Sequence, residues 1–117
     1  MPILAATTLT SEQVIIKKVP QFSDVLVAVE ILKNLGKSVC FENNNLLISG
    51  EITSNVINKN LSNKLRASLF FVGAVLSKLG RVKFFEAGGC KLGERPINFH
   101  LKSFELLGAT IIQEDET

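Results

Sequence analysis

The apolar residues between Ser23 and Gly36 fall on one face of a helix. They are Val25, Ala28, Val29, Leu32 and Leu35. This alternation of three- and four-residue steps is typical of a helix that buries one face in a core. Ser23 suits the N-cap, Asp24 suits the first turn, and Gly36 is expected to end the helix. The pattern therefore predicts an amphipathic helix between these two residues.

Two other segments are predicted to be helical. Residues 2–9 are predicted to be helix, and residues 96–107 are predicted to form a second helix that Pro96 begins. The inward positions expected for the second helix are Ile97, Leu101, Phe104 and Leu107.

The longest helix is expected from Leu61 to Leu79, after a loop over residues 50–60. Between Ala67 and Leu76 this segment is apolar on every face. A helix with no polar face is typical of one that is buried on all sides. The pattern therefore predicts a central helix with other elements packed around it.

Short apolar runs bounded by polar residues, glycine or proline predict strands. The runs are residues 13–17, 39–42, 46–49, 81–85 and 109–113. Asn43, Asn44 and Asn45 lie between the second and third runs, and asparagine tolerates left-handed backbone. These two runs are therefore predicted to form a β-hairpin.

Three predicted helices end in the dipeptide Leu-Gly. The dipeptides are Leu35-Gly36, Leu79-Gly80 and Leu107-Gly108. Each is followed by a predicted strand that reaches a glutamate six residues after the glycine. The repeated unit is a helix, a glycine stop and a strand. Layers of such units around buried helices predict an α/β (α+β) fold in a single domain.

Composition narrows the possible partners. The chain has 117 residues, of which 46% are hydrophobic and 21% charged, as in a globular domain. Its 13 basic and 11 acidic residues are scattered and leave a net charge of +2, so nucleic acid is not an expected partner. Residues 67–76, the longest charge-free apolar run, fall short of the roughly 20 residues that span a bilayer. No membrane segment is expected, and the N-terminus lacks a basic leader, so a cytoplasmic location is expected.

Packing does not explain the composition of residues 86–100. Three glycines fall within six residues there: Gly88, Gly89 and Gly93. Glycine permits positive φ and lets the backbone approach a ligand closely. Cys90 lies among the glycines, with Lys91 and Arg95 nearby and a helix expected to begin at Pro96. Cations and a helix N-terminus both favour an anion, which here is either a thiolate or a phosphate.

Each candidate residue also has a structural interpretation. Cys90 is either a reactive or acid-base thiol or an inert small apolar side chain. Arg95 is either a bidentate phosphate or carboxylate ligand or a solvated cation. For Arg66 a structural ion pair is as good an interpretation as ligand binding. His100 lies beside the apolar face of its predicted helix and is expected to be a hydrogen-bonded packing residue.

The chain shows no sequence signature of a bound metal or cofactor. Its one histidine and two distant cysteines, Cys40 and Cys90, lack metal-ligand spacing. Neither a phosphate-binding loop motif nor a dinucleotide fingerprint is present. Neither a metal nor a cofactor is therefore expected, and both cysteines are expected to be free thiols.

Residues 88–100, Gly-Gly-Cys-Lys-Leu-Gly-Glu-Arg-Pro-Ile-Asn-Phe-His, closely resemble the UDP-N-acetylglucosamine 1-carboxyvinyltransferase family. The loop Gly-Gly-Cys-x-x-Gly-x-Arg-Pro is not shared with the related shikimate enolpyruvyl transferases. Further matches are Phe-Glu-Leu-Leu-Gly-Ala over residues 104–109, Leu-Arg-Ala-Ser over 65–68, Pro-Ile-Leu-Ala-Ala over 2–6, and Val19-Pro20 with Asp24. The resemblance extends over essentially the whole chain.

The resemblance implies a transferase of peptidoglycan synthesis. It implies transfer of an enolpyruvyl group from phosphoenolpyruvate to the 3-hydroxyl of UDP-N-acetylglucosamine, with release of phosphate. Cys90 is implied to be the proton donor, which can form an adduct with phosphoenolpyruvate and is the thiol that fosfomycin alkylates. Arg66 is implied to reach the nucleotide sugar, and Arg95 to contact phosphate. The residues implied to line the UDP-sugar site are Arg95, Pro96, Ile97, Asn98 and Phe99.

The chain departs from the family in sequence and in extent. Ala87 stands where the family usually has proline, and Asn98 where it has aspartate. The family's phosphoenolpyruvate-binding Lys-Asn pair and its catalytic aspartate have no counterpart here. The expectation is a partial, cysteine-loop-bearing domain, truncated at both ends, with some of the family's βαβαββ repeats. Alone it is expected to be inactive and to self-associate through surface exposed by truncation.

Two other functions remain open. A noncatalytic UDP-sugar-binding or assembly module would keep the contacts of Arg66 and Arg95 without turnover. A thiol-dependent redox protein would use Cys90, although no resolving cysteine lies near it in sequence. Binding of UDP-N-acetylglucosamine distinguishes the first two functions from the third, and phosphate release distinguishes the transferase from the binding module.

Overall fold

The computed structural model describes residues 2–64, 69–85 and 98–112. Over these ranges it contains helices and one antiparallel sheet, which confirms the predicted α/β (α+β) class. The helices are α1 (Pro2–Ala6), the 3-10 helix η1 (Thr7–Leu9), α2 (Ser23–Leu35), α3 (Lys59–Lys64), α4 (Leu69–Leu79) and α5 (Asn98–Leu106). The strands are β1 (Val14–Ile16), β2 (Ser38–Glu42) and β3 (Asn45–Ser49).

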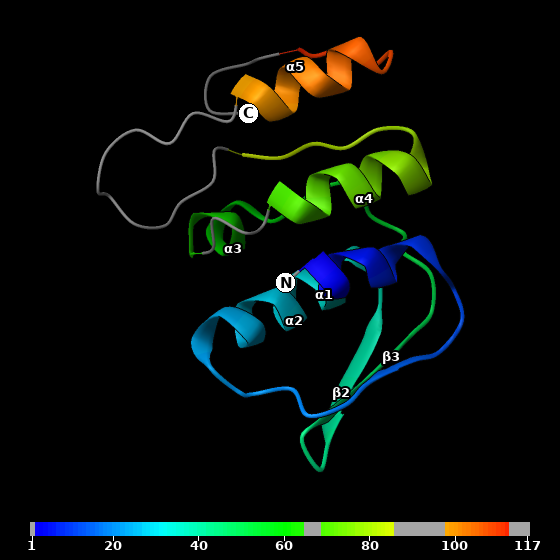
Figure 1. Cartoon of the computed structure of the whole chain (residues 1–117), viewed down its shortest axis with the longest axis vertical. Helices are drawn as coiled ribbons and strands as arrows, with labels where there is room; N and C mark the ends of the chain where they lie inside the picture. The colour runs from blue at the N-terminus through cyan, green and yellow to red at the C-terminus, as the bar shows by residue number, and fades with distance from the viewer. Residues whose placement is uncertain (1, 65–68, 86–97, 113–117) are drawn as a thin grey trace.

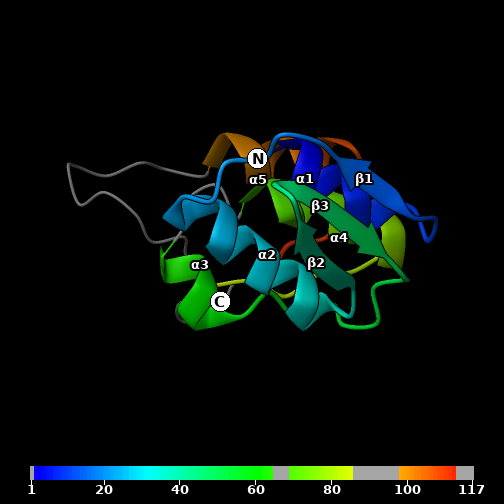
Figure 2. The ribbon, with the colours of Figure 1, turned by 90° about the horizontal axis from the view of Figure 1, so that it is seen from below.

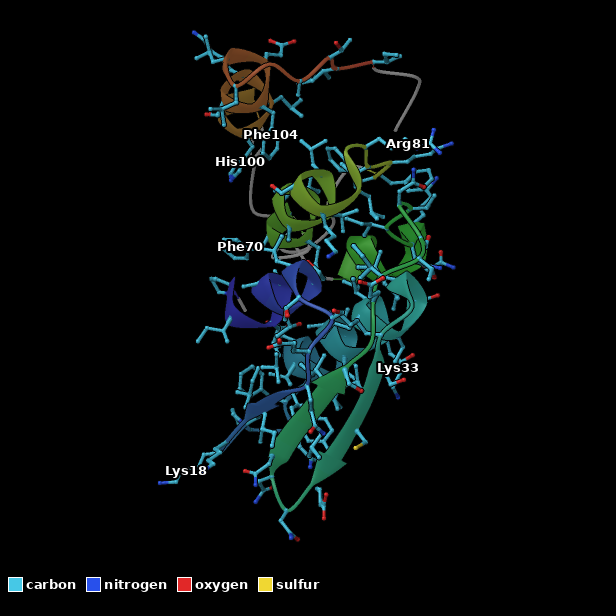
Figure 3. All side chains as sticks on the ribbon, turned by 90° about the vertical axis from the view of Figure 1, so that its right-hand side faces the viewer. Lys18, Lys33, Phe70, Arg81, His100 and Phe104 are labelled. Carbon is cyan, nitrogen blue, oxygen red and sulfur yellow. The ribbon has the colours of Figure 1, made fainter. Side chains whose placement is uncertain are left out.

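The elements lie in successive layers (Figure 1). The sheet and α2 form one end of the molecule, and α1 and η1 pack against α4. On the other side of α4 lies α5, as the side view in Figure 3 also shows. The core passes through these layers, because buried apolar side chains come from α1, α2, β3 and α4. They include Leu4, Ile31, Leu32, Leu46, Ile48, Phe71 and Val75.

The structure confirms the predicted inward face of α2 and corrects its first residue. The five apolar positions assigned to that face are all buried. The N-cap is Phe22 rather than Ser23, and no side chain caps the helix. At the other end Gly36 has a φ of +114°. Its N–H donates to the carbonyl of Lys33 at 3.1 Å, and the N–H of Lys37 donates to that of Leu32 at 3.0 Å, which together form a Schellman motif.

The predicted hairpin is present, with a two-residue turn. Asn43 and Asn44 have φ values of 52° and 65°, as a type I′ turn requires, and Asn45 already belongs to β3. The strand order is β1-β3-β2, so β3 is central (Figure 2). Leu46 and Ile48 of β3 are fully buried, whereas the alternate residues Asn45, Leu47 and Ser49 are partly exposed. The sheet therefore has one buried face.

The prediction that the central helix is buried on all sides is wrong in part. In α4, Phe71, Val72 and Val75 are buried, but Phe70 is 47% exposed. The expected loop before it is also shorter, because α3 begins at Lys59. Whether α3 and α4 are continuous depends on residues 65–68, which lie outside the described residues. Among the described residues, no helix is long and apolar enough to cross a membrane.

The last two predicted strands do not form as expected. Residues 81–85 contribute a single parallel bridge, between Lys83 and Val56, and residues 109–112 contain no strand. Gly80 and Gly108 lie just after α4 and α5, where they were predicted to end the helices, and both have a positive φ. Leu107 is 86% exposed instead of inward, because α5 ends at Leu106 and Leu107 no longer follows the helical period. An apolar run becomes a strand only where another strand pairs with it. Among the described residues, no strand pairs with residues 109–112.

Candidate functional site

Most of the predicted site residues lie outside the described residues. These are Arg66, Cys90, Arg95, Pro96 and Ile97. Asn98 and Phe99 are the first residues of α5, and their side chains also lie outside the described set. The structure therefore describes the elements on either side of the two site segments, residues 65–68 and 86–97.

Residues 65–68 follow α3 and precede α4. The start of α3 is held by Asn58, whose Oδ1 accepts the N–H of Leu61 at 3.1 Å. The helix itself packs against α2. On the other side, α4 is anchored by the fully buried side chains of Phe71 and Val75. Both flanks of the Arg66 segment are therefore tied to the core.

The residues before the 86–97 segment lie beside the residues that lead into α3. The N–H of Lys83 donates to the carbonyl of Asn55 at 2.8 Å, and the N–H of Ile57 donates to that of Lys83 at 2.9 Å. Phe85 is the last described residue before the segment. The Nζ atom of Lys59, in α3, lies 5.7 Å from the centre of its ring, a distance at which a cation is attracted to the ring face.

The residues after the 86–97 segment form α5, which rests on α4. Figure 3 shows Phe104 between these two helices. Two ring carbons of Phe104 lie 3.7 Å from the place that a Cβ atom at Gly73 would occupy. The absence of a side chain at Gly73 thus lets the ring lie directly over α4. The described residue before the 86–97 segment, Phe85, therefore lies beside Lys59 of α3, and the helix after the segment contacts α4 through Phe104.

Sequence reasoning missed a cationic feature beside the predicted loop. The Nζ atom of Lys83 lies 6.0 Å from the centre of the Phe85 ring, and Lys59 approaches the same ring. Lys83 and Phe85 are two residues apart, a spacing that places side chains on one face of an extended segment, so this part could have been found. No sequence signal pointed to Lys59, which the fold brings from a distant segment.

The other candidates take ordinary positions. His100 is exposed on α5, so the expectation that it is a packing residue beside the apolar face is wrong. Among the described residues, no group of three His, Cys, Asp or Glu side chains is placed to hold a metal ion. Cys40 is a free thiol and is exposed, because the alternation of β2 turns Val39 and Phe41 toward the core instead.

Cys90 is expected to react with iodoacetamide faster than Cys40 at neutral pH. Lys91 and Arg95 follow Cys90 closely in sequence, and nearby cations favour the reactive thiolate. Because Cys40 is exposed, it serves as an accessible reference thiol in the same chain. Brief alkylation followed by peptide mapping gives both rates, and single variants Cys40→Ser and Cys90→Ser give each rate alone. Equal rates, or faster labelling of Cys40, would contradict an activated thiol at position 90.

Comparison with known proteins agrees with the motif. The family model described as EPSP synthase (3-phosphoshikimate 1-carboxyvinyltransferase) matches residues 1–117. A UDP-N-acetylglucosamine 1-carboxyvinyltransferase of Finegoldia magna is 38% identical over 99% of this chain and 28% of its own length. Proteins of that name from Caldanaerobacter subterraneus and Thermotoga maritima are 41% and 40% identical over 95% of the chain and 27% of their own length.

The chain thus spans about a quarter of the length of the curated relatives it matches, at 27–28% of each. The relatives carry the name of the family that residues 88–100 resemble, so the recognition from sequence is confirmed. The family model carries the name of the shikimate branch, and it covers the chain from end to end. The chain therefore belongs to the EPSP synthase family, and these relatives are UDP-N-acetylglucosamine 1-carboxyvinyltransferases.

Proposed function

We propose that this chain is a segment of a transferase that moves the enolpyruvyl group of phosphoenolpyruvate to UDP-N-acetylglucosamine in peptidoglycan synthesis. The observation that carries the proposal is the identity of 38–41% to proteins named for that reaction, over nearly the whole chain. The loop motif over residues 88–97 supports the same branch of the family. A nucleotide-sugar substrate favours a cytoplasmic location.

In this proposal Cys90 donates a proton to the methylene carbon of phosphoenolpyruvate, and the sugar hydroxyl adds to the neighbouring carbon as it loses its own proton to the family's catalytic aspartate. Loss of phosphate from that carbon and of a proton from the new methyl group then restores the double bond. Cys90 is also the proposed target of fosfomycin. Arg95 contacts phosphate, since its planar fork suits a bidentate anion. Arg66 reaches the nucleotide sugar, and residues 95–99 line the sugar site. A thiol suits proton transfer when neighbouring cations bring its pKa toward neutrality.

The described residues support this arrangement in two ways. The helices that flank the Arg66 segment, α3 and α4, are contacted by Phe85 before the Cys90 segment and by Phe104 after it. Lys59 and Lys83 add positive charge beside Phe85, where the Cys90 segment begins. Both proposed substrates carry phosphate groups, and positive charge at the approach to a site raises the local concentration of anionic ligands.

We also propose that this chain alone binds UDP-N-acetylglucosamine weakly and does not turn it over. The residues implied to hold phosphoenolpyruvate from the opposite side, and the catalytic aspartate, have no counterpart in the chain. General acid-base help is worth on the order of 10² to 10⁴ in rate, and correct placement of reactants is worth more. Phosphate release from both substrates is therefore expected to equal that of a Cys90→Ala control.

Two measurements test the proposal separately. Titration calorimetry with UDP-N-acetylglucosamine tests the sugar site, with Arg95→Ala as the weakened variant and Lys102→Ala, an exposed lysine of α5, as the matched control. Loss of binding in Arg95→Ala alone supports the site. No binding by any variant would count against the sugar site. Turnover above the Cys90→Ala control would show a complete active site.

The proposal includes self-association of the chain. Large apolar side chains are exposed near its C-terminus: Leu106 at 79%, Leu107 at 86% and Ile112 at 76%. Apolar surface of this kind favours association with another apolar surface. Sedimentation velocity at the assay concentration therefore accompanies both measurements, so that each result is assigned to a known oligomer.

A further inference from the structure

Lys37 is a buried lysine whose amino group joins three parts of the chain. The residue is 4% exposed. Its Nζ donates hydrogen bonds to the carbonyl of Thr10 and, at 2.5 Å, to the carbonyl of Gly50. Lys37 lies between α2 and β2, Thr10 follows η1, and Gly50 follows β3. A single ammonium group therefore connects the N-terminal segment, residues 2–10, to the open end of the β2–β3 hairpin, where Ser38 pairs with Ser49.

The surroundings of Lys37 disfavour its charge. The described residues provide no carboxylate in salt-bridge contact with it. Burial, and then the neighbouring charge of Lys78, lower the pKa of Lys37 below 10.5, while Glu51 acts in the opposite direction. The charged form is thus less favourable in the folded protein than in water. Burying an ammonium group costs more than burying an apolar side chain of similar length.

Within the described part of the chain, Lys37 is the residue that joins the N-terminal segment to a distant segment by a hydrogen bond. The hydroxyls of Thr7 and Thr8 are buried, but they donate to the carbonyls of Leu4 and Ala5 in the same segment. Apolar contacts hold α1 and η1 against α4. Apolar contacts attract the N-terminal segment to α4 without fixing its register along the helix. The hydrogen bonds of Lys37 to the carbonyls of Thr10 and Gly50 are directional, so they set the position of Thr10 relative to Gly50.

We propose that Lys37 is a conformational lock that fixes where the N-terminal segment lies, and that it lowers stability while doing so. The segment in turn forms the surface on which α4 packs. Helix α4 directly follows residues 65–68, the segment that contains Arg66. The position that Lys37 gives the N-terminal segment therefore also affects α4. The inference stands apart from the proposed transferase activity, since it concerns the described core alone.

The test is Lys37→Met in the full chain, followed by hydrogen exchange. Without the two bonds, amides of residues 7–12 are expected to exchange about tenfold faster, as the loss of a charge-assisted hydrogen bond implies. Amides of α2 are expected to keep their protection, and the melting temperature is expected to stay the same or rise. Gly50 is exposed and Thr10 partly so, and water can therefore solvate their carbonyls once the segment moves.

The pH dependence supplies a second readout. Because the pKa of Lys37 is lowered on folding, the unfolded chain binds more protons between the folded pKa and 10.5. Stability is therefore expected to rise with pH in that window. Of the described charged groups, Lys78 on α4 and Glu51 after β3 are those that act on Lys37. Lys37→Met should remove this rise, and Lys78→Gln should reduce it without changing exchange in residues 7–12.

Three results would overturn the proposal. The first is unchanged exchange over residues 7–12 in Lys37→Met. The second is a large fall in melting temperature, or failure to fold, with exchange faster in α2 as well, because Lys37 would then stabilise the whole fold. The third is an equal rise of stability with pH in the wild type and in Lys37→Met.

Discussion

Replacement of Gly36 by alanine is expected to lower the free energy of unfolding by about 2–5 kcal/mol. Strain from the left-handed backbone contributes about 1–2 kcal/mol of this loss. The steric clash of the new Cβ atom contributes about 1–3 kcal/mol. Gly36 has a φ of +114°. A Cβ atom there would lie 2.6 Å from Oγ1 of Thr53, 3.0 Å from its backbone nitrogen and 3.2 Å from the carbonyl of Glu51. The N–H of Thr53 donates to the carbonyl of Leu35 at 2.7 Å, so moving Thr53 also breaks the bond that caps α2.

Gly108 offers a matched control for this substitution. It ends α5 with a φ of +104°, and its neighbour Ala109 donates to the carbonyl of Phe104 at 2.9 Å, as in the Schellman motif at Gly36. Among the described residues, no atom beyond its chain neighbours lies within 4 Å of the place that its Cβ would take. Gly108→Ala therefore carries the left-handed strain alone, about 1–2 kcal/mol. Urea unfolding gives both values, and an equal loss in the two variants would show that the clash with Thr53 is relieved without cost.

Truncation of Phe71 to alanine is expected to lower the free energy of unfolding by about 3–5 kcal/mol, the usual loss for a large buried aromatic side chain. Phe71 is fully buried in α4. Its ring belongs to the cluster that joins Leu4 of α1 with Leu32 of α2. The substitution leaves a cavity where these layers meet, so the packing of α4 on the rest of the fold should weaken.

Phe70 is the control for this substitution, because it is the preceding residue of the same helix and is 47% exposed. Phe70→Ala is expected to cost about 1 kcal/mol or less, as is usual for a partly exposed side chain. Urea unfolding of both variants tests the assigned faces of α4. A loss in Phe70→Ala as large as that in Phe71→Ala would mean that α4 is buried on every side, as the apolar pattern predicted.

The sequence supplied the candidate site residues, and their roles stay predictions, whereas the structure supplied the surroundings of the two segments that hold them. A thiol among glycines, followed by an arginine and a proline, identifies the loop because those residue types are required for close approach to an anion. The pairing of Lys83 with Asn55 and Ile57 was not visible, since the partners are distant in sequence. The same pairing brings Lys59 to Phe85 and adds positive charge beside that ring, which no sequence motif indicated.

Local rules by themselves determined α2, the Asn43–Asn44 turn and the glycine ends of three helices. A helical period, a left-handed φ and a missing Cβ are properties of adjacent residues, and they hold wherever the segment is placed. Tertiary structure alone decided which side of α4 is buried, whether residues 109–112 pair, and what the amino group of Lys37 binds. These outcomes depend on surfaces brought from elsewhere in the chain, because an apolar face or a lone donor does not specify its partner.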